Sequence, residues 1–411
     1  MIVDGGGRGQ ALATKLAPEC QELFVSPGNP GNEAFAYGTG IAPTDVVEQL
    51  SFAKRNKIDL TVVGADDPLA YGIVDDFQAE GLTIFGPTAA QARIESDRQF
   101  AKKLAQNLGV PIGSQAGFTD RAEARRYAQA PERRWPLFVK DNELAQGKGA
   151  KRCDSMKDVK RVIGAMSRFV IEDYVEGPEA SHHSFCDGKT QLSIPFLVRD
   201  HKQIGEGDTG LMTGGMGTVG PLHNYTPEEV AQLGRVFVEP VVRQTGFKGV
   251  IFSGLKGVKG HEQNLEWNAR FGDPEAQLFL RLMKSDLLPV IMACVEGDLD
   301  TLPTPQWDMA QSAVCLVLAT QGYPAKPQKG AVIEGIETAA TIAGVDVLQA
   351  GTAQKVAGLI VNGGRVLNMV ATADTLQAAL DRAYEAAECI LFNGLEPVYR
   401  KDIGLTTLID G

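Results

Sequence analysis

The residues best suited to bind a metal ion alternate along one short segment, Leu265–Glu266–Trp267–Asn268–Ala269–Arg270. In a strand, side chains two positions apart lie on the same face, so Glu266, Asn268 and Arg270 would point the same way. A carboxylate beside an amide oxygen suits Mg²⁺, which takes few protein ligands and fills its octahedral shell with water and phosphate oxygens. The alternative is the polar face of an ordinary amphipathic strand.

The next segment, Phe271–Gln277, has the sequence F-G-D-P-E-A-Q. An Asp followed by a Pro is typical of a helix start, and it predicts Asp273 as the N-cap and Pro274 as the first helical residue. Capping alone would account for both residues. Because the segment follows a candidate metal-binding strand, it would also place a carboxylate and a helix N-terminus beside phosphate groups.

Two lysines lie at and after a predicted strand, Leu137–Lys140. Lys140 ends the strand, and Lys148 stands between two glycines in Gly147–Lys148–Gly149. Glycines allow a loop to close over phosphate groups, and lysines neutralise the phosphate charge. The spacing is not that of a Walker loop, and a solvated turn is the alternative.

A further predicted strand, Phe169–Tyr174, begins apolar and turns polar at its carboxyl end. Backbone groups at such an end can pair with the edge of an adenine, and the carboxylate of Glu179 can then hold ribose hydroxyls. A plain strand end without a ligand is the alternative.

A glycine-dense segment from Gly205 to Gly220 contains D-T-G at Asp208–Gly210 and T-G-G-M-G at Thr213–Gly217. Backbone N–H groups exposed by these glycines can form an anion-binding nest. Flexible linkage is the alternative, but a linker of this length would more often contain Ser or Pro. The segment therefore predicts a ligand-binding loop.

The other reactive side chains give no active-site pattern. His182 and His183 are adjacent on a predicted strand, so they face opposite sides, cannot bind one metal together in the usual way, and are interpreted as structural. No Ser–His–Asp or Cys–His arrangement stands out. The six cysteines are scattered without a C-x-x-C pair, which favours reduced thiols over a disulfide framework or a zinc site. What remains is a Mg²⁺-dependent site that handles phosphate groups.

The elements that must position these residues divide the chain into three parts. Over the first hundred residues, short apolar runs alternate with helical patterns, which predicts a parallel α/β domain with ligands beyond the carboxyl ends of its strands. A helix at about Arg98–Leu108 leads into strand-like runs with a type I′ hairpin turn at Asp187–Gly188 and a second hairpin within Val250–Arg270. After a linker at Thr301–Pro305, strands mix with one long helix, Thr375–Cys389.

Length, composition and charge exclude several classes of protein. The 411 residues exceed what one hydrophobic core usually supports, and 44% hydrophobic with 22% charged residues match an ordinary globular protein. The net charge of −11 argues against nucleic acid or an anionic membrane as the main partner. The N-terminus leaves no room for a signal peptide, and the longest apolar stretch, around Ala313–Ala319, is too short to cross a membrane. We expect a soluble, cytoplasmic protein.

These segments, in this order, resemble the phosphoribosylamine–glycine ligase family along nearly the whole chain. The most specific match is E-W-N-A-R-F-G-D-P-E-A-Q at Glu266–Gln277, close to the family's E-F-N-x-R-F-G-D-P-E-x-Q. D-H-K-Q-I-G-E-G-D-T-G-L-M-T-G-G-M-G at Asp200–Gly217 is similar to D-H-K-R-x-x-x-x-D-T-G-P-N-T-G-G-M-G, and L-A-Q-G-K-G-A at Leu144–Ala150 resembles L-A-x-G-K-G-V. Weaker agreement comes from short motifs at Pro27–Asn29, Phe85–Thr88, Asn362–Leu367 and Arg400–Gly404.

The resemblance implies an α/β fold in three domains: a Rossmann-like N-terminal domain (1–97), an ATP-grasp module (98–305) with a mobile lid subdomain at about 115–180, and a small mixed α/β C-terminal domain (306–411). It also implies a reaction. ATP phosphorylates the carboxylate of glycine, and the amine of 5-phosphoribosylamine attacks the acyl phosphate to give glycinamide ribonucleotide, ADP and phosphate. The expected cofactors are ATP and Mg²⁺, with Mn²⁺ as a substitute, and the expected assembly is a monomer or weak homodimer.

The same resemblance implies a role for each matching residue. The residues expected to bind ATP are Lys102, Lys140, Lys148, Glu172, Asp173, Tyr174, Val175 and Glu179, the last of these on ribose. Glu266 and Asn268 would bind Mg²⁺, and Arg270 and Asp273 would be catalytic residues at the acyl phosphate. The residues expected to bind the other substrates are Gly6, Gly7, Asn29, Asp66, Asp208, Thr213, Gly214, Gly215, Met216 and Gly217.

Several positions depart from the family pattern, mostly on the side of the amine substrate. Gly9 and Gln10 replace an acid and a histidine in the family's G-G-R-E-H-A-L, Asp66 replaces a glutamate and Arg98 replaces a lysine. We therefore expect weakened binding of 5-phosphoribosylamine, which a Gly9→Glu/Gln10→His double variant should restore. The alternatives are a divergent ATP-grasp ligase that joins an amino acid to another amine, and a non-catalytic nucleotide-binding paralogue.

Overall fold

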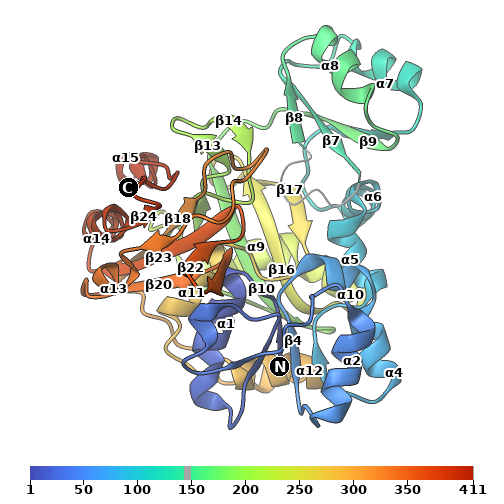
Figure 1. The fold of residues 1–411 in the computed structure, drawn as a ribbon. Coiled ribbons are helices and arrows are strands. Elements are labelled where there is room, and N and C mark those ends of the chain that lie inside the picture. The colour runs from blue at the N-terminus through green and yellow to red at the C-terminus, as the bar shows by residue number, and fades with distance from the viewer. Residues whose placement is uncertain (143–149, 411) are drawn as a thin grey trace.

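The N-terminal part is a parallel sheet with helical connections, as predicted. The computed structural model describes residues 1–142 and 150–410 (Figure 1). The strands run in the order β3-β2-β1-β4-β5, with bounds β1 (Ile2–Val3), β2 (Phe24–Ser26), β3 (Tyr37–Gly38), β4 (Thr61–Val63) and β5 (Ile84–Phe85). The helices between them are α1 (Gly7–Leu16), α2 (Val46–Arg55), α3 (Asp66–Ala70), α4 (Ile73–Ala79) and α5 (Ala89–Ser96), with 3-10 turns η1 (Ala17–Glu19) and η2 (Pro30–Asn32). Because β2 and β4 flank β1, the carboxyl end of β1 lies where the strand order reverses, which is the usual ligand position in such sheets.

A separate lobe projects from the body at the upper right of Figure 1, and we call its residues 115–173 the lid lobe. Its antiparallel sheet has the order β6-β9-β7-β8. The elements of the lobe are β6 (Gln115–Phe118), α7 (Arg121–Ala128), β7 (Leu137–Asp141), β8 (Ala150–Cys153), α8 (Met156–Ile163) and β9 (Phe169–Asp173). The lobe has a hydrophobic core of its own, around Val139, Val159 and Ile171, and helix α6 (Arg98–Leu108) connects it to the N-terminal sheet. Motion of the lobe stays a prediction.

The middle of the chain forms an antiparallel sheet that contains the candidate metal-binding strand. Its order is β11-β10-β16-β17, with bounds β10 (Glu179–Asp187), β11 (Gln191–Ser193), β16 (Lys248–Lys256) and β17 (Gln263–Asn268). The helices of this part are α9 (Pro227–Phe237), α10 (Glu239–Thr245), α11 (Glu275–Leu282) and α12 (Leu288–Glu296), followed by the 3-10 turn η3 (Leu299–Thr301).

Both predicted hairpins of this sheet are present, but one turn type is wrong. A type I′ turn needs positive φ at both central residues, whereas Gly188 has φ of 91° and Asp187 is not among the residues with positive φ. The strands pair at Cys186 and Gln191, and the Asp187 N–H donates to the carbonyl of Thr190 at 3.3 Å, so the turn has Gly188 and Lys189 at its centre instead of Asp187 and Gly188. Its cause is the Asp187 carboxylate, which accepts hydrogen bonds from the backbone N–H groups of Lys189 (2.8 Å) and Thr190 (2.7 Å).

The C-terminal part is built on a sheet that draws strands from two regions of the chain. The order is β12-β15-β18-β23-β20, with bounds β12 (Arg199–Asp200), β15 (Gly217–Gly220), β18 (Ser312–Ala319), β20 (Val345–Gln349) and β23 (Arg365–Ala373). The smaller elements are β13 (Gln203–Gly205), β14 (Thr209–Met212), β19 (Ile333–Glu334), β21 (Thr352–Lys355), β22 (Gly358–Val361), β24 (Leu391–Phe392), α13 (Ile336–Ala339), α14 (Leu376–Glu388) and α15 (Leu405–Asp410). Since β12 and β15 precede residue 305, the division at 97 and 305 stays a prediction.

The N-terminal, middle and C-terminal parts of the chain contribute to one hydrophobic core. One core joins Leu12 of α1, Phe279 of α11 and Leu348 of β20, so all three regions of the chain pack against one another. Among the described residues, the lid lobe contributes nothing to this shared core, and the C-terminal part has a second core formed by its own sheet and helices. Across residues 1–142 and 150–410, no helix is both long enough and apolar enough to cross a membrane.

Candidate functional site

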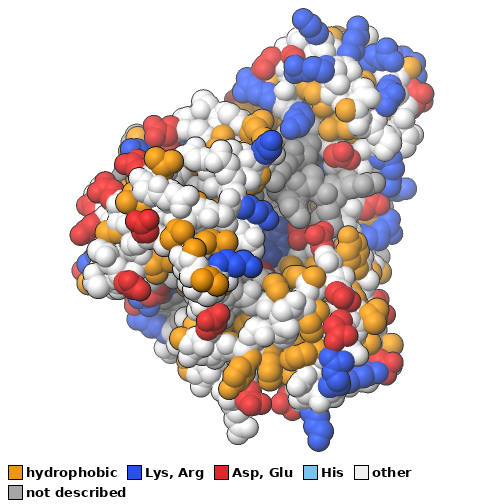
Figure 2. All heavy atoms as spheres, viewed as in Figure 1, with side chains coloured by type: hydrophobic (Ala, Val, Ile, Leu, Met, Phe, Trp, Pro, Cys, Tyr) orange, Lys and Arg blue, Asp and Glu red, His pale blue; other side chains and the backbone are white. Residues whose placement is uncertain are grey.

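A cavity of about 300 Å³ lies where the lid lobe, the central sheet and both flanking sheets meet. Figure 2 shows the hollow between the lid lobe and the body. The predicted site residues that line it are Asp66, Lys102, Lys140, Glu172, Asp173, Tyr174, Val175, Glu179, Thr213, Gly214, Glu266, Asn268, Arg270 and Asp273. Lys148 lies outside the described residues. The predicted site residues that do not line the cavity are Gly6, Gly7, Asn29, Asp208, Gly215, Met216 and Gly217.

Two lysines from different elements converge on one buried carboxylate. Glu172 of β9 pairs with Lys102 of α6 at 3.1 Å and with Lys140 of β7 at 2.7 Å. Burial alone would raise the pKa of Glu172, but the two lysines outweigh that effect and lower it to about 2. The three side chains together carry one net positive charge, so this part of the cavity favours an anion such as a phosphate group. Glu172 therefore orients both lysines, and its expected place beside adenine stays a prediction.

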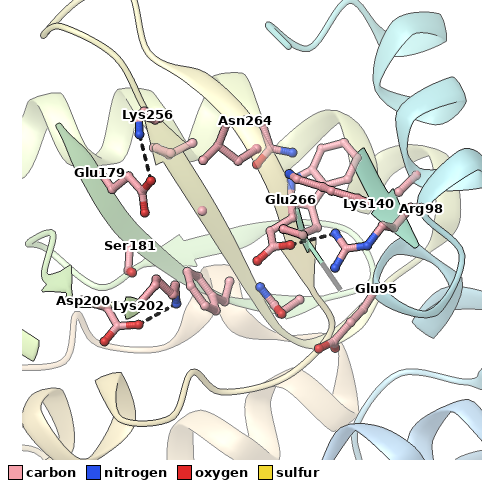
Figure 3. A pocket seen from close by; sticks show the side chains of 18 of the residues that line it. Glu95, Arg98, Lys140, Glu179, Ser181, Asp200, Lys202, Lys256, Asn264 and Glu266 are labelled. Carbon is pink, nitrogen blue, oxygen red and sulfur yellow. Dashed lines mark hydrogen bonds and ion pairs between the residues drawn. The ribbon is translucent and has the colours of Figure 1, made fainter. Parts of the chain in front are cut away.

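The far end of the cavity combines an aromatic ring with an ion pair. The ring of Tyr174 stacks on that of Phe138, with centroids 6.1 Å apart, and Lys256 lies 5.0 Å from the Tyr174 centroid. Lys256 also pairs with Glu179 at 2.9 Å, and the two face each other in Figure 3. An aromatic ring beside a carboxylate suits a nucleoside, whose base stacks and whose ribose donates hydrogen bonds.

The predicted face of β17 is confirmed. Glu266, Asn268 and Arg270 all line the cavity; the intervening Trp267 borders it too, but its buried indole N–H donates to the carbonyl of Phe237 at 3.1 Å. The Glu266 carboxylate pairs with Arg98 at 2.8 Å (Figure 3). Although burial opposes ionisation, Arg98 and then Lys140 hold the pKa of Glu266 well below its usual value.

The chemistry of these side chains fits a divalent ion with few protein ligands. Glu266 offers a carboxylate and Asn268 an amide oxygen, and the amide Nδ2 of Asn268 is buried without a hydrogen-bond partner. In the described part of the chain no group of three or more His, Cys, Asp and Glu residues could hold a metal. An ion bound here would complete its shell with water and phosphate oxygens, as Mg²⁺ does.

Arg270 is fixed from three sides. Its guanidinium pairs with Glu95 at 2.9 Å and donates to Asn268 Oδ1 at 3.2 Å and to the carbonyl of Phe271 at 3.0 Å. Burial raises the pKa of Glu95, and Arg270 opposes that effect. Held in this way, Arg270 presents a fixed positive charge to the cavity.

The prediction that Asp273 is a helix N-cap is wrong. Helix α11 begins at Glu275, its N-cap is Pro274, and no side chain caps it. The Asp273 carboxylate instead accepts hydrogen bonds from Arg365 of β23 at 2.7 Å and from Gln277 Nε2 at 2.6 Å. A charge-assisted bond to a guanidinium is stronger than a cap to a backbone N–H, so the distant arginine decides the orientation.

Arg365 also positions the glycine loop. Besides Asp273, it donates to the carbonyl of Gly214 at 2.7 Å, and Gly214 and Thr213 line the cavity. Of the predicted ligand-binding loop, only Met212, Thr213 and Gly214 are among the lining residues, and Gly217 begins the buried strand β15. Asp208 lies at the turn of the β13–β14 hairpin and pairs with Arg400 at 2.6 Å.

Two buried carboxylates and a lysine line the cavity close to Asp273. Lys202 pairs with Asp200 at 2.6 Å and lies 3.7 Å from Glu275 (Figure 3 shows the first pair). Glu275 Oε1 accepts from Ser181 at 3.0 Å, while Glu275 Oε2 is buried without a hydrogen-bond partner. Burial raises the pKa of Asp200 to about 7, with Lys202 opposing and Glu275 adding to the rise. The group has one carboxylate more than it has cations.

The glycine turn after β1 is occupied by a carboxylate of the chain itself. Asp4 accepts hydrogen bonds from the backbone N–H of Gly6 at 2.8 Å and from Arg8 Nε, and Arg8 also donates to the carbonyl of Phe271 at 2.9 Å. These are the donors that an anionic ligand uses at a helix N-terminus. Asp4 therefore occupies one backbone donor of the turn, the Gly6 N–H, where the sequence predicted a bound substrate.

Gly9 and Gln10 serve packing, which corrects the interpretation of their departure from the family. Gln10 donates to the carbonyl of Gly31 at 3.1 Å and accepts from the N–H of Gln349 at 2.6 Å, so it ties α1 to β20. A Cβ at Gly9 would lie 2.0 Å from the Asp4 carbonyl oxygen. The Gly9→Glu/Gln10→His variant would disrupt this packing, so the expected restoration is wrong on steric grounds.

Asn29 has a similar structural role. Its amide donates to the carbonyls of Gly5 at 3.3 Å and Gln349 at 3.0 Å, and its Oδ1 caps η2 by accepting from Gly31. The side chain therefore fixes the glycine turn against the C-terminal part rather than facing the cavity.

The histidines have the structural role that was expected. His182 and His183 lie on opposite faces of β10; His182 Nε2 contacts Ser193 Oγ at 3.1 Å, and His183 Nε2 accepts the N–H of Gly272 at 3.2 Å. Burial lowers the pKa of both to about 3, so both are neutral.

Sequence reasoning missed several charged residues of the site. Those that line the cavity but were not predicted are Arg8, Glu95, Asp200, Lys202, Lys256, Glu275 and Arg365, and Arg98 was noted only as a departure. Asp200, Lys202 and Glu275 stand inside the quoted motifs, which was a usable signal. The pairing of Arg365 with Asp273, 92 residues away, had none.

Models of one protein family match the chain in three consecutive segments. The N domain of phosphoribosylglycinamide synthetase matches residues 1–95, its ATP-grasp (A) domain residues 96–276, and its C domain residues 313–406. Together they account for most of the chain.

Curated relatives agree with this assignment over the full length. A phosphoribosylamine–glycine ligase from Brucella melitensis is 38% identical, covering 98% of this chain and 97% of the relative. One from Ralstonia nicotianae is 39% identical, with 98% of each chain covered.

Solved structures show the same fold. The crystal structure of the phosphoribosylamine–glycine ligase from Thermotoga maritima has a TM-score of 0.81 and 27% identity, covering 98% of this chain and 99% of that one. The biotin carboxylase domain of the 2-oxoglutarate carboxylase from Hydrogenobacter thermophilus, at 16% identity and a TM-score of 0.74, shares the fold alone. With three matching domains and full-length relatives above 30% identity, the chain belongs to the phosphoribosylglycinamide synthetase family of ATP-grasp proteins.

Proposed function

We propose that the protein is an ATP-dependent carbon–nitrogen ligase that joins glycine to 5-phosphoribosylamine in purine biosynthesis. The γ-phosphoryl group of ATP passes to the glycine carboxylate, which gives glycyl phosphate and ADP. The amine then attacks the acyl carbon, the bond to phosphate breaks, and glycinamide ribonucleotide and phosphate are released. The observation that carries this proposal is the convergence, in one cavity, of Lys102, Lys140 and Arg270 with the oxygen pair Glu266 and Asn268.

The nucleotide lies along the lid lobe in this proposal. The base and ribose lie at the Tyr174 and Glu179 end, with Asp173 and Val175 beside the base, and the phosphates extend toward Lys102 and Lys140. Lys148, outside the described residues, is expected to join them. Positioning and charge neutralisation supply most of the catalysis in phosphoryl transfer, so buried lysines with fixed partners suit the task.

Glu266 and Asn268 are proposed to hold Mg²⁺, for which Mn²⁺ can substitute. When bound, the ion would neutralise charge on the phosphate groups and on the transferring phosphoryl group. Two oxygen ligands leave most of its shell for water and phosphate, which excludes a closed structural site.

Glycine is proposed to lie between Arg270 and the Asp200–Glu275 pair. Arg270, Asp273 and the backbone of Thr213–Gly214 face its carboxylate and the acyl phosphate. Its ammonium fits the two carboxylates, because Lys202 compensates only one of them and Glu275 Oε2 has no partner. A free amino acid is therefore preferred over a simple carboxylic acid.

Most of the residues predicted to bind the amine substrate do not line the cavity. Asp66 lines the cavity next to Arg8, but Gly6, Gly7, Asn29 and Asp208 lie outside it. Because Asp4 already occupies the donors of the glycine turn, an amine with a different anionic group or none is the second candidate. A non-catalytic role is disfavoured, since Glu266, Asn268 and Arg270 keep their arrangement.

Product analysis tests the proposal. Purified protein is incubated with Mg·ATP, glycine and freshly generated 5-phosphoribosylamine, and ADP and glycinamide ribonucleotide are quantified by mass spectrometry. Omitting glycine should abolish both products. A panel of other amines is run in parallel, and a higher kcat/KM for any of them than for 5-phosphoribosylamine would replace the proposed amine substrate.

A further inference from the structure

Arg98 forms an ion pair with Glu266, the carboxylate that is proposed to bind the metal. Its terminal nitrogen NH1 donates to Glu266 Oε2 at 2.8 Å, and Figure 3 shows the pair at the edge of the cavity beside Lys140. The Nε of the same guanidinium is buried without a hydrogen-bond partner. Arg98 lines the cavity, so an acceptor that enters the cavity can reach its guanidinium. A phosphate oxygen is the acceptor that a guanidinium binds best.

The backbone of Arg98 is bound to the lid lobe. Its N–H donates to the carbonyl of Asn142 at 3.2 Å, next to the carboxyl end of β7. The neighbouring Gln99 donates from its backbone to Asn142 Oδ1 at 2.9 Å and from its side chain to the carbonyls of Phe118 and Phe169 at 3.2 and 3.3 Å. The first turn of α6 is therefore part of the lid sheet's hydrogen-bond network.

One turn later, α6 is bound to the metal-binding strand. Lys102 donates to the carbonyl of Leu265 at 2.8 Å, directly before Glu266 on β17. Arg98 and Lys102 are four residues apart, so their side chains leave the same face of the helix. This helix thus connects the lid lobe to β17, and the Arg98–Glu266 pair lies between the two.

We propose that Arg98 is a positioning residue that holds Glu266 in the nucleotide-free protein and releases it to the metal when nucleotide phosphates engage its guanidinium. This rests on the proposed function, because it takes Glu266 as a metal ligand. In the absence of nucleotide, a divalent ion must displace Arg98 from Glu266. Phosphate groups offer Arg98 a new partner, so metal and nucleotide raise each other's affinity, as linkage requires.

The test measures metal binding directly, without turnover. Mn²⁺ is titrated into the full-length protein, with and without ADP, and free Mn²⁺ is followed by electron paramagnetic resonance. Arg98→Gln removes the competing charge and should tighten Mn²⁺ binding without ADP by about tenfold or more, the worth of one charge-assisted hydrogen bond. ADP should also increase the Mn²⁺ affinity of this variant by a smaller factor than it does for the unmodified protein. Arg98→Lys, which keeps the charge, should stay closer to the unmodified protein.

A matched control separates this effect from general electrostatics. Lys54→Gln removes one positive charge from an exposed surface pair, Lys54 with Glu80, that does not line the cavity. It should leave Mn²⁺ affinity without ADP unchanged, and circular dichroism should show that every variant is folded.

Three outcomes would overturn the inference, and they differ in what they imply. Equal Mn²⁺ affinity without ADP in Arg98→Gln and the unmodified protein removes the role of Arg98, while the metal site stands if Glu266→Gln abolishes ADP-supported binding. An equal gain in Lys54→Gln reduces the effect to net charge. Normal Mn²⁺ binding in Glu266→Gln with ADP present refutes both this inference and the proposed metal ligand.

Discussion

The two ends of the site treat charge in opposite ways. At the nucleotide end, three cations (Arg98, Lys102 and Lys140) face two carboxylates, Glu172 and Glu266, so positive charge is left over for an incoming anion. At the glycine turn, Arg8 is paired with Asp4, and Asp66 lines the cavity nearby. The first end is arranged to receive phosphate, and the second is already neutralised by the chain.

This difference shows that a glycine motif alone does not make an anion site. Both ends have glycines and a nearby arginine or lysine, and both match the family pattern in part. What separates them is whether a carboxylate close in sequence reaches the same donors first. Asp4 does so from two residues before Gly6, whereas Lys102 and Lys140 share the single carboxylate of Glu172, which leaves one positive charge in excess.

The largest expected effect is at the nucleotide end. Glu266→Gln keeps the size of the side chain but removes the charge proposed to bind the metal, so ADP formation should fall by about a thousandfold. Circular dichroism and the melting temperature should stay close to those of the unmodified protein. Glu228→Gln, on the exposed surface of α9, is the control. Near-normal ADP production by Glu266→Gln at ordinary Mg²⁺ would contradict the metal assignment.

A second substitution tests the arginine that holds Asp273 and the Thr213–Gly214 loop. Arg365→Gln removes the partner of Asp273 and the donor to Gly214, so the glycine loop loses its anchor. We expect kcat/KM for glycine to fall by about tenfold to a hundredfold, corresponding to one or two charge-assisted hydrogen bonds. The KM for ATP should change little. Equal losses for glycine and ATP would show that Arg365 supports the whole cavity rather than the glycine loop.

Acid should lower the free energy of unfolding through the buried His183. His183 is neutral and accepts the N–H of Gly272, and burial lowers its pKa to about 3. The unfolded chain binds a proton near pH 6.5, so the stability from this histidine is complete above that pH and is lost as the pH falls toward 3, by about 2 kcal/mol at pH 5. His183→Gln should make this decline less steep in urea unfolding between pH 7.5 and 5, while His182, whose pKa is also lowered to about 3, keeps its share. Equal slopes for His183→Gln and the unmodified protein would refute the assignment.

The smallest expected effect is at the glycine turn. Asp4→Asn keeps the acceptor for the Gly6 N–H but removes the negative charge that now occupies the turn. The KM for 5-phosphoribosylamine should fall by about threefold to tenfold, since less repulsion opposes its phosphate. Asp45→Asn, at the N-cap of α2, is the matched control for loss of a capping carboxylate. An unchanged or higher KM in Asp4→Asn would mean that the phosphate binds elsewhere.

Local pattern predicted those features whose cause is local. The shared face of Glu266, Asn268 and Arg270 follows from strand periodicity, and α6 has the expected bounds, Arg98–Leu108, because Asp97 caps its start and Gly109 ends it in the left-handed conformation. The residues that the family motifs assign to ATP and metal line one cavity, apart from Lys148, which lies outside the described residues.

The wrong predictions concern side chains whose orientation is set by a partner far away in the sequence. Asp273 has the sequence of an N-cap, but Arg365 binds its carboxylate from another sheet. Gln10 stands where the family has a histidine and was interpreted as the loss of a substrate-binding residue. Its side chain instead accepts the N–H of Gln349 and so connects α1 to β20. Neither partner lies within reach of a local pattern, and one sequence contains no sign of which distant residues meet.

The C-terminal sheet constrains the order in which the protein can be made. Strand β15 is synthesised long before β18, yet in the sheet they pair along Gly217–Gly220, and β18 then separates β15 from β23. Until Ser312–Ala319 emerges from the ribosome, β15 has an open edge on that side. Exposed edges attract other strands, so the nascent chain is vulnerable to aggregation over this interval. Completion of the cavity, which needs Arg365 from β23, is accordingly among the last events of synthesis.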